Sequence, residues 1–268
     1  MVDYQYLLDA GISRKPNSGE VFTEELNIKL AIMNREQLKK DFFPAELMLK
    51  LYRDLADCGA EAKIKLIDEY IEKVRDSYDE DVLFIKQHNQ IAHMHFMSGQ
   101  HEQAISYFEM VVEKMAPDDY PPIYFLAINL LIRSNCILTN YDVAKQWGEL
   151  ALKNHHHADP ISNLHILNDY MDVLSETETD LDKKHYSVIQ SIIDEYGFPE
   201  KLRDPVETIR SMNKRHKIWA RKMGDLTLNY AKPDGAATFE DLERYIESCE
   251  IGWYRNYARN MLDKLKSN

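Results

Sequence analysis

Apolar residues recur at helical spacing through most of this chain. Between about positions 44 and 196 they form segments of about 13 to 16 residues, separated by turns of about two to six residues. The chain holds only 9 Gly and 9 Pro among 268 residues, so these segments run with few breakers. The pattern predicts an all-α protein. Two helices are also indicated before the most regular part of the pattern. The first runs from Thr23 and carries Leu26, Leu30 and Met33. The second opens at Pro44, carries Leu47, Leu51 and Leu55, and ends near Gly59.

The most regular unit runs from Asp81 to Pro117. Its first helix carries Phe84, Ile91 and Ala92, its turn is Ser98-Gly99-Gln100, and its second helix carries Ala104, Phe108 and Val111. Small residues allow two helices to approach closely, an aromatic ring fills the gap to the next pair, and glycine permits the chain to reverse. The unit therefore predicts a pair of antiparallel helices.

The spacing of Ala92, Gly99, Ala104, Phe108, Val111 and Pro117 resembles the tetratricopeptide repeat (TPR). The resemblance implies a right-handed superhelix of antiparallel helix pairs, a TPR-like α-solenoid with a C-terminal helical cap. One departure is His95, which stands where the family has a tyrosine. A weaker unit follows 40 residues later, in which Ala144 and Ala151 match Ala104 and Val111. Ile132, Thr139 and Gly148 replace Ala92, Gly99 and Phe108.

Two further units complete the predicted array. Gly59 precedes Gly99 by 40 residues, and residues 160–174 with 182–196 form a last pair that ends at Gly197 and Pro199. The period exceeds the roughly 34 residues of a TPR, so other helical repeats and a non-repeat helical bundle stay open as alternatives. The predicted divisions are 1–43 for an N-terminal arm and helical extension, 44–200 for the repeats and 201–268 for the cap.

In such arrays the first helix of each pair lines the concave face, and its polar residues are candidate contacts. Asparagine can bond a peptide backbone, and the cations Lys86 and Arg133 can bind a carboxylate. The family's Lys and Asn carboxylate clamp is not reproduced in full. Solvated positions or bonds between neighbouring helices are the alternative interpretation. The predicted partner-binding residues are Lys86, Asn89, His93, Phe96, Asn129, Arg133, Cys136, His165, Asp169 and Asp172.

A second candidate surface lies in Lys201–Lys222, which holds eight basic residues against two acidic ones. Such an amphipathic helix either caps the last repeat or binds a polyanion such as nucleic acid. We prefer the cap, because a solenoid end needs a cover and the flanking chain is acidic. Its apolar stripe is Val206, Ile209, Met212, His216, Trp219 and Met223, and its basic stripe is Arg210, Lys214, Lys217 and Arg221.

The net charge of −12 argues against general affinity for nucleic acid or anionic lipid. No run of about 18 apolar residues and no signal peptide is apparent, and three scattered cysteines suggest a reducing compartment, so we expect a cytoplasmic protein. His155-His156-His157 precedes a turn at Pro160, which favours a solvated loop over a metal site.

No catalytic motif is recognisable, so we expect neither an enzyme nor a bound cofactor. The predicted function is a protein–protein interaction scaffold that holds a peptide or protein on its concave face. The alternative is a peptide-sensing regulator of a transcription or nucleic-acid partner. No helix-turn-helix precedes the repeats, so such a regulator would act through another protein.

Overall fold

A computed structural model describes residues 34–230 and 239–266, with the side chains of 228–230 excepted. The described residues form α-helices joined by short turns and contain no strand, which confirms the all-α prediction. The expected helix after Thr23, the turn at 232–235 and the expected cap Thr238 lie outside the described residues.

The helices follow the predicted order, with short connections between them. Their bounds are α3 Arg35–Leu38, α4 Ala45–Leu49, α5 Ala60–Val74, α6 Glu80–Met97, α7 His101–Lys114, α8 Pro121–Ile137, α9 Tyr141–Lys153, α10 Pro160–Glu176, α11 Tyr186–Tyr196, α12 Pro205–Tyr230, α13 Phe239–Ser248 and α14 Gly252–Lys266. The π-helix η1 (Lys50–Asp54) continues α4, and the 3-10 turns η2 (Arg75–Ser77), η3 (His155–His157) and η4 (Lys183–His185) lie between helices.

Local sequence explains where several helices begin. The carboxylates of Asp79 and Asp159 each accept bonds from two backbone N–H groups in the first turns of α6 and α10. Pro121, Pro160 and Pro205 stand at the starts of α8, α10 and α12, where a missing N–H costs nothing. Helix α12 starts at Pro205 rather than at Lys201, because Asp204 accepts a bond from the N–H of Glu207 at 2.8 Å.

Helices α6, α8 and α10 end in the same backbone turn. Gly99, Thr139 and Glu178 have φ of 73°, 61° and 51°. In each turn the N–H of the next residue donates to the carbonyl of the residue five positions before it. These bonds join Gln100 to His95 at 2.9 Å, Asn140 to Asn135 at 2.8 Å and Thr179 to Leu174 at 3.0 Å. This bond satisfies a carbonyl at the helix end and reverses the chain into the next helix.

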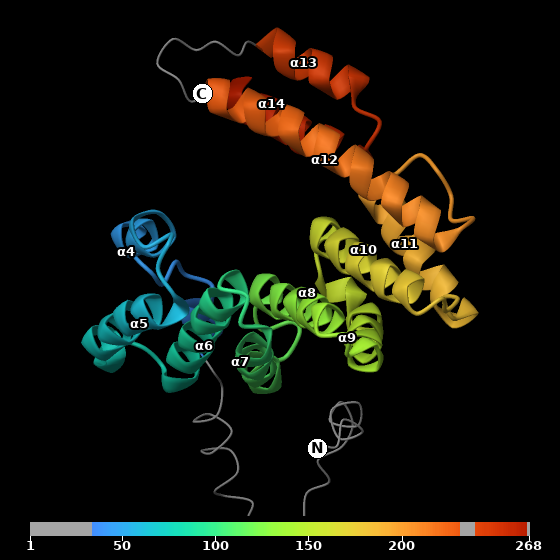
Figure 1. Cartoon of the computed structure of the whole chain (residues 1–268). Coiled ribbons are helices and arrows are strands. Elements are labelled where there is room, and N and C mark those ends of the chain that lie inside the picture. The colour runs from blue at the N-terminus through green and yellow to red at the C-terminus, as the bar shows by residue number, and fades with distance from the viewer. Residues whose placement is uncertain (1–33, 231–238, 267–268) are drawn as a thin grey trace, which may run out of the picture.

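Consecutive helices pack against one another, from α5 on α6 through α9 on α10, and α10 also contacts α8, α11 and α12. Helices α5 to α10 follow an arc, and α12 leads away from α10 toward α13 and α14 (Figure 1). The core residues predicted for the 81–117 unit are buried, with Ala92, Ala104, Phe108 and Val111 all at 0% exposure. A C-terminal core extends from Leu152 to Ala258, so residues on both sides of the predicted division at 200/201 share it.

The predicted apolar stripe of α12 packs as expected. Ile209, Met212, His216, Trp219 and Met223 are buried against neighbouring helices. Val206 is half-buried. The amphipathic helix therefore packs along α10 and also contacts α14.

Candidate partner-binding face

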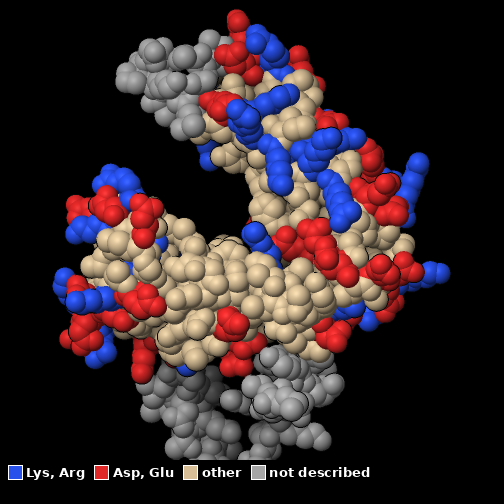
Figure 2. Space-filling model, in the orientation of Figure 1, with Lys and Arg blue, Asp and Glu red and all other residues tan. Residues whose placement is uncertain are grey.

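Helices α8, α10 and α12 bring distant parts of the sequence to one surface. Helix α10 packs against α8 on one side and α12 on the other. Helices α10 and α12 run antiparallel, because Arg210 meets Asp172 while Asn213, one turn later, meets Asn168, one turn earlier. Beside these helices the molecule is hollowed between the α12–α14 arm and the α6–α8 region, and uncharged residues cover most of the hollow (Figure 2).

A row of polar side chains crosses these three helices at Asp169. Asn129 of α8 donates to Asp169 Oδ2 at 2.8 Å, and Asn168 donates to Asp169 Oδ1 at 3.2 Å. The Nε of Arg133 lies 3.6 Å from Asp169 Oδ2. Burial raises the pKa of Asp169, against the opposing effects of Asn168, Arg133 and Asn129. The carboxylate thus holds α8 to α10 through hydrogen bonds that partly offset its desolvation.

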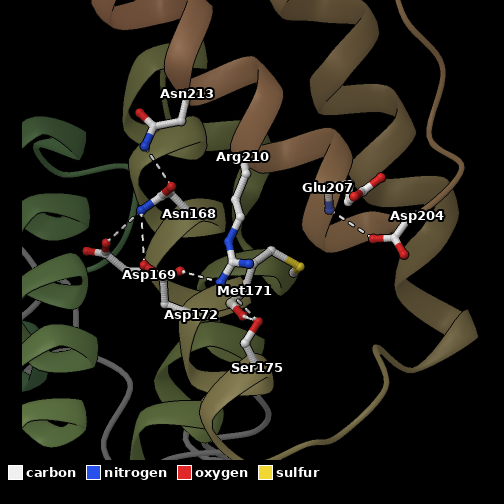
Figure 3. Close-up of polar contacts among 9 residues, drawn as sticks. All are labelled: Asn168, Asp169, Met171, Asp172, Ser175, Asp204, Glu207, Arg210 and Asn213. Carbon is white, nitrogen blue, oxygen red and sulfur yellow. Dashed lines mark hydrogen bonds and ion pairs between the residues drawn. The ribbon is translucent and has the colours of Figure 1, made fainter.

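The row continues from α10 to α12. Asn213 donates to Asn168 Oδ1 at 2.6 Å, and Asn168 also lies 3.4 Å from Asp172 Oδ2 (Figure 3). Arg210 reaches Asp172 Oδ1 at 3.4 Å and the Ser175 hydroxyl at 3.3 Å. The side chains of Arg210 and Asp172 are about half exposed, so this ion pair contributes little stability. We call Asn129, Arg133, Asn168, Asp169 and Asn213 the polar row.

Arg133 is the exposed member of the polar row. Its side chain is 51% exposed, and its guanidinium carbon lies 5.6 Å from the centre of the Phe96 ring. Arg133 donates no hydrogen bond to a described residue, and its ion pair with Asp169 is long at 3.6 Å. Its terminal nitrogens can bind a carboxylate in a two-point arrangement. Arg133 therefore offers the row a free cationic group beside an aromatic ring.

Cys136 and His165 flank the row on α8 and α10. Burial raises the pKa of the Cys136 thiol, and the charges of Glu176, Asp172 and Asp169 raise it further. The thiol is therefore protonated at neutral pH and unsuited to nucleophilic chemistry. His165 is exposed, and its ring packs edge-on against that of His216 at 5.3 Å.

The pKa of His165 is lowered, first by desolvation and then by the charges of Lys217 and Arg133, while Asp169 and Asp159 oppose the shift. Lys217 belongs to α12 and Arg133 to α8. The contact with His216 places the His165 ring beside α12, where Lys217 follows His216.

The three predicted contacts on α6 nearest its start do not join the row. Lys86 is buried and donates to the Lys40 carbonyl at 3.2 Å, with its ammonium 5.0 Å from the Tyr120 ring centre. Lys86 was expected to be free to bind a carboxylate, and its burial by residues near 40 and 120 makes that expectation wrong. Asn89 is half-buried, and its Oδ1 has no hydrogen-bond partner among the described residues.

His93 also points into the structure. Its ring packs edge-on against Phe108 at 5.4 Å, and burial lowers its pKa to about 4. Asn129 is buried as well, so its part in the row is to bond Asp169 rather than to meet a partner directly. The bonds between neighbouring helices, which the sequence left as an alternative, account for Asn129 and Asp169.

Sequence reasoning missed Asn168 and Asn213 and placed Arg210 on a separate surface. The 40-residue spacing of Asn89, Asn129 and Asp169 was the available signal for the row, and it stops before α12. Among the described helices, none combines the length and hydropathy needed to span a bilayer. Searches of protein-family models, curated proteins and solved structures found no match to this chain.

Proposed function

We propose that this chain is a TPR-like helical scaffold that binds a polypeptide segment on the surface formed by α6, α8, α10 and α12. The pairs α6–α7, α8–α9 and α10–α11 are its repeats, and α12 to α14 form its C-terminal cap. The shared turn after α6, α8 and α10, repeated at intervals of 40 and 39 residues, supports the repeat assignment. The buried Ala104 and Ala144, also 40 residues apart, support the same register.

The observation that carries the proposal is the exposure of the Arg133 side chain together with its contacts. This half-exposed side chain lies 3.6 Å from Asp169 and has its guanidinium carbon 5.6 Å from the centre of the Phe96 ring. An extended segment can place its backbone carbonyls or a carboxylate on the free guanidinium nitrogens. Leu126 lies two helical turns before Arg133 on α8 and is 42% exposed, so it supplies apolar contact on the same side of the helix.

The setting that we propose is the cytoplasm, with a protein or peptide as partner and no cofactor. All three cysteines are free, and Cys58 is exposed. Free exposed thiols persist in reducing compartments, which supports this placement.

The test is affinity capture from the native host, followed by mass spectrometry, with the intact chain and the variant Arg133→Ala. Partners of the concave surface should be lost or weakened by more than about 1 kcal/mol, the scale of a lost charge-assisted hydrogen bond. Melting temperatures should match, because Arg133 is half exposed and its pair with Asp169 is long.

The matched control is Gln146→Ala with Lys153→Ala, two exposed positions on α9. These changes should leave every captured partner bound. Partners that survive Arg133→Ala at full strength would place binding elsewhere and overturn the proposed function.

A further inference from the structure

The polar row and the basic stripe of α12 belong to one surface. Arg210 and Asn213 of α12 both bond to α10, at Asp172 and Asn168. Lys214, Lys217 and Arg221 follow Arg210 at intervals of four, three and four residues, so they continue along the side of the helix that Arg210 occupies. The stripe therefore starts where α12 touches the polar row and extends along α12 beyond it.

Arg210 is the stripe's only member with a described acidic partner. Lys214, Lys217 and Arg221 are exposed, and none bonds an acid in the described part of the chain. Acids do pair elsewhere on this helix, where Arg215 bonds Glu200 and lies 3.1 Å from Glu250. Three cations within about 10 Å of helix axis, in a chain of net charge −12, thus remain without an internal counter-charge.

The stripe also lies beside a second contact between α12 and α10. The ring of His165 packs edge-on against that of His216 at 5.3 Å, and Lys217 follows His216 in the chain. On α10, Asp169 is already bonded by Asn129 and Asn168. The α12 cations thus begin where α12 packs against α10, beside the half-exposed Asp172.

Exposed apolar groups occur on both helices. Ile218 of α12 follows Lys217 and is 46% exposed, and Leu126 of α8 is 42% exposed. The space-filling view shows basic side chains along the α12–α14 arm and mostly uncharged residues in the hollow beside it (Figure 2). The surface therefore complements a segment that carries both carboxylates and apolar side chains.

We propose that the bound segment is acidic and that Lys214, Lys217 and Arg221 of α12 hold its carboxylates while its apolar residues lie against α8. This inference rests on the proposed function and names the chemistry of its partner. Nucleic acid fits less well, because Glu207 and Asp172 lie beside Arg210 at the start of the stripe and would repel a continuous phosphate chain. An acidic peptide can direct its few carboxylates to the cations and avoid these acids.

The test begins with a display library of random 12-residue peptides selected on the intact protein. Selected peptides are synthesised with a fluorescent label, and their affinities are measured by anisotropy at low and moderate salt. We expect an excess of Asp and Glu in the selected peptides, together with leucine-type residues. Their affinity should fall several-fold as the salt concentration rises, because the cations are exposed.

Three variants separate the possible surfaces. The triple change Lys214→Gln, Lys217→Gln and Arg221→Gln should weaken peptide binding at least tenfold. The matched control removes three exposed charges on α5 and α9 and should change affinity less than twofold. Lys217→Gln alone should weaken binding about threefold, which keeps the test valid if the triple variant unfolds. The control changes are Lys65→Gln, Lys73→Gln and Lys153→Gln.

Other results would overturn the inference in distinguishable ways. If the selected peptides were neutral and their binding required Arg133 but not the stripe, the acidic-partner proposal would be wrong and the proposed function would be supported. If no selected peptide depended on Arg133 or the stripe, both would fail. A 20-residue oligothymidylate that bound more tightly than every peptide, and needed the stripe, would identify a nucleic-acid surface instead.

Discussion

The helix pairs α6–α7 and α8–α9 share one register 40 residues apart and fill their interiors differently. In the first pair, the ring of Phe108 is fully buried and packs against His93. Gly148 stands at the matching position of the second pair. A Cβ added there would lie 2.3 Å from Cδ2 of Tyr170 on α10, so the next helix supplies the ring. The same backbone register therefore accepts an aromatic from within the pair or from its neighbour.

The first helices of the two pairs also differ at a matching position. His93 of α6 is neutral and packed inward, whereas its counterpart Arg133 of α8 is charged and half exposed. At this matched position the second pair therefore carries an exposed cation and the first does not. This difference shows how a shared backbone can carry packing in one unit and the proposed partner contact in the next.

The strongest test of the shared register is a carboxylate placed at the helix crossing of each pair. Ala104→Glu and Ala144→Glu should each reduce the free energy of unfolding by about 3 to 5 kcal/mol, because both sites are fully buried and offer the charge no partner. Urea unfolding measures the loss. Gln103→Glu, at an exposed neighbouring position, should change stability by less than about 0.5 kcal/mol. If the two variants lost clearly different free energies of unfolding, the two positions would not be equivalent.

The variant Gly148→Phe tests whether the ring of Tyr170 fills the space that Phe108 fills in the first pair. It gives α9 the aromatic ring that α7 carries. The new side chain would occupy the place of Tyr170, and we expect a loss of about 3 kcal/mol. Adding Tyr170→Ala should recover at least about 1 kcal/mol, because it removes the ring that conflicts. Independent, additive losses in the double variant would show that Tyr170 does not fill this space.

Local spacing was enough to predict the core of these pairs. Ala92, Ala104, Phe108 and Val111 are all buried as expected, because burial on one side of a helix repeats at a fixed interval in sequence. The burial of Lys86 was not predictable in this way. Its partner Lys40 and the covering ring of Tyr120 come from distant segments, whose placement depends on how whole helices pack.

The candidate site was predicted in part for the same reason. The 40-residue interval aligned Asn129 with Asp169, and these residues do bond each other. The contact of Asn168 with Asn213 spans 45 residues and depends on the direction that α12 takes after Pro205. The polar row and the basic stripe therefore looked like rival surfaces in the sequence, although α10 joins them.

The difference between His93 and Arg133 predicts a local response to acid. The folded-state pKa of His93, about 4, lies below its ordinary value of 6.5, so the neutral ring stabilises the fold above pH 6.5. This stability is lost progressively as the pH falls from 6.5 to about 4, by ~1.4 kcal/mol for each pKa unit at most. Because the ring edge contacts solvent, we expect a loss of about 2 kcal/mol.

Hydrogen exchange at pH 7 and pH 4.5 should locate this loss. Protection should fall more in α6 and α7 than in α8 and α9, since Arg133 keeps its charge throughout this range. The variant His93→Gln should show a smaller decline between the two pH values. An equal decline in both pairs would assign the acid response to other groups, such as His216, whose pKa burial also lowers to about 4.

The smallest expected effect concerns the turn that the two pairs share. Gly99 and Thr139 both have a positive φ, at 73° and 61°, and both precede the same backbone bond. A β-branched residue in this left-handed conformation costs about 1 kcal/mol, and nothing lies within 4 Å of a Cβ added at Gly99. Gly99→Thr should therefore lose about 1 kcal/mol for backbone reasons alone.

The reverse change, Thr139→Gly, should gain about 0.5 kcal/mol, because relief of the strained φ exceeds the added entropy of the unfolded chain. Gly224→Ala is the control, since Gly224 lies within α12 with nothing within 4 Å of an added Cβ, and it should stabilise by about 1 kcal/mol. Thermal melts of the three variants give the order of stability. If Gly99→Thr stabilised the protein, the turns at Gly99 and Thr139 would differ in backbone conformation. The 40-residue register would then no longer be supported by a shared turn.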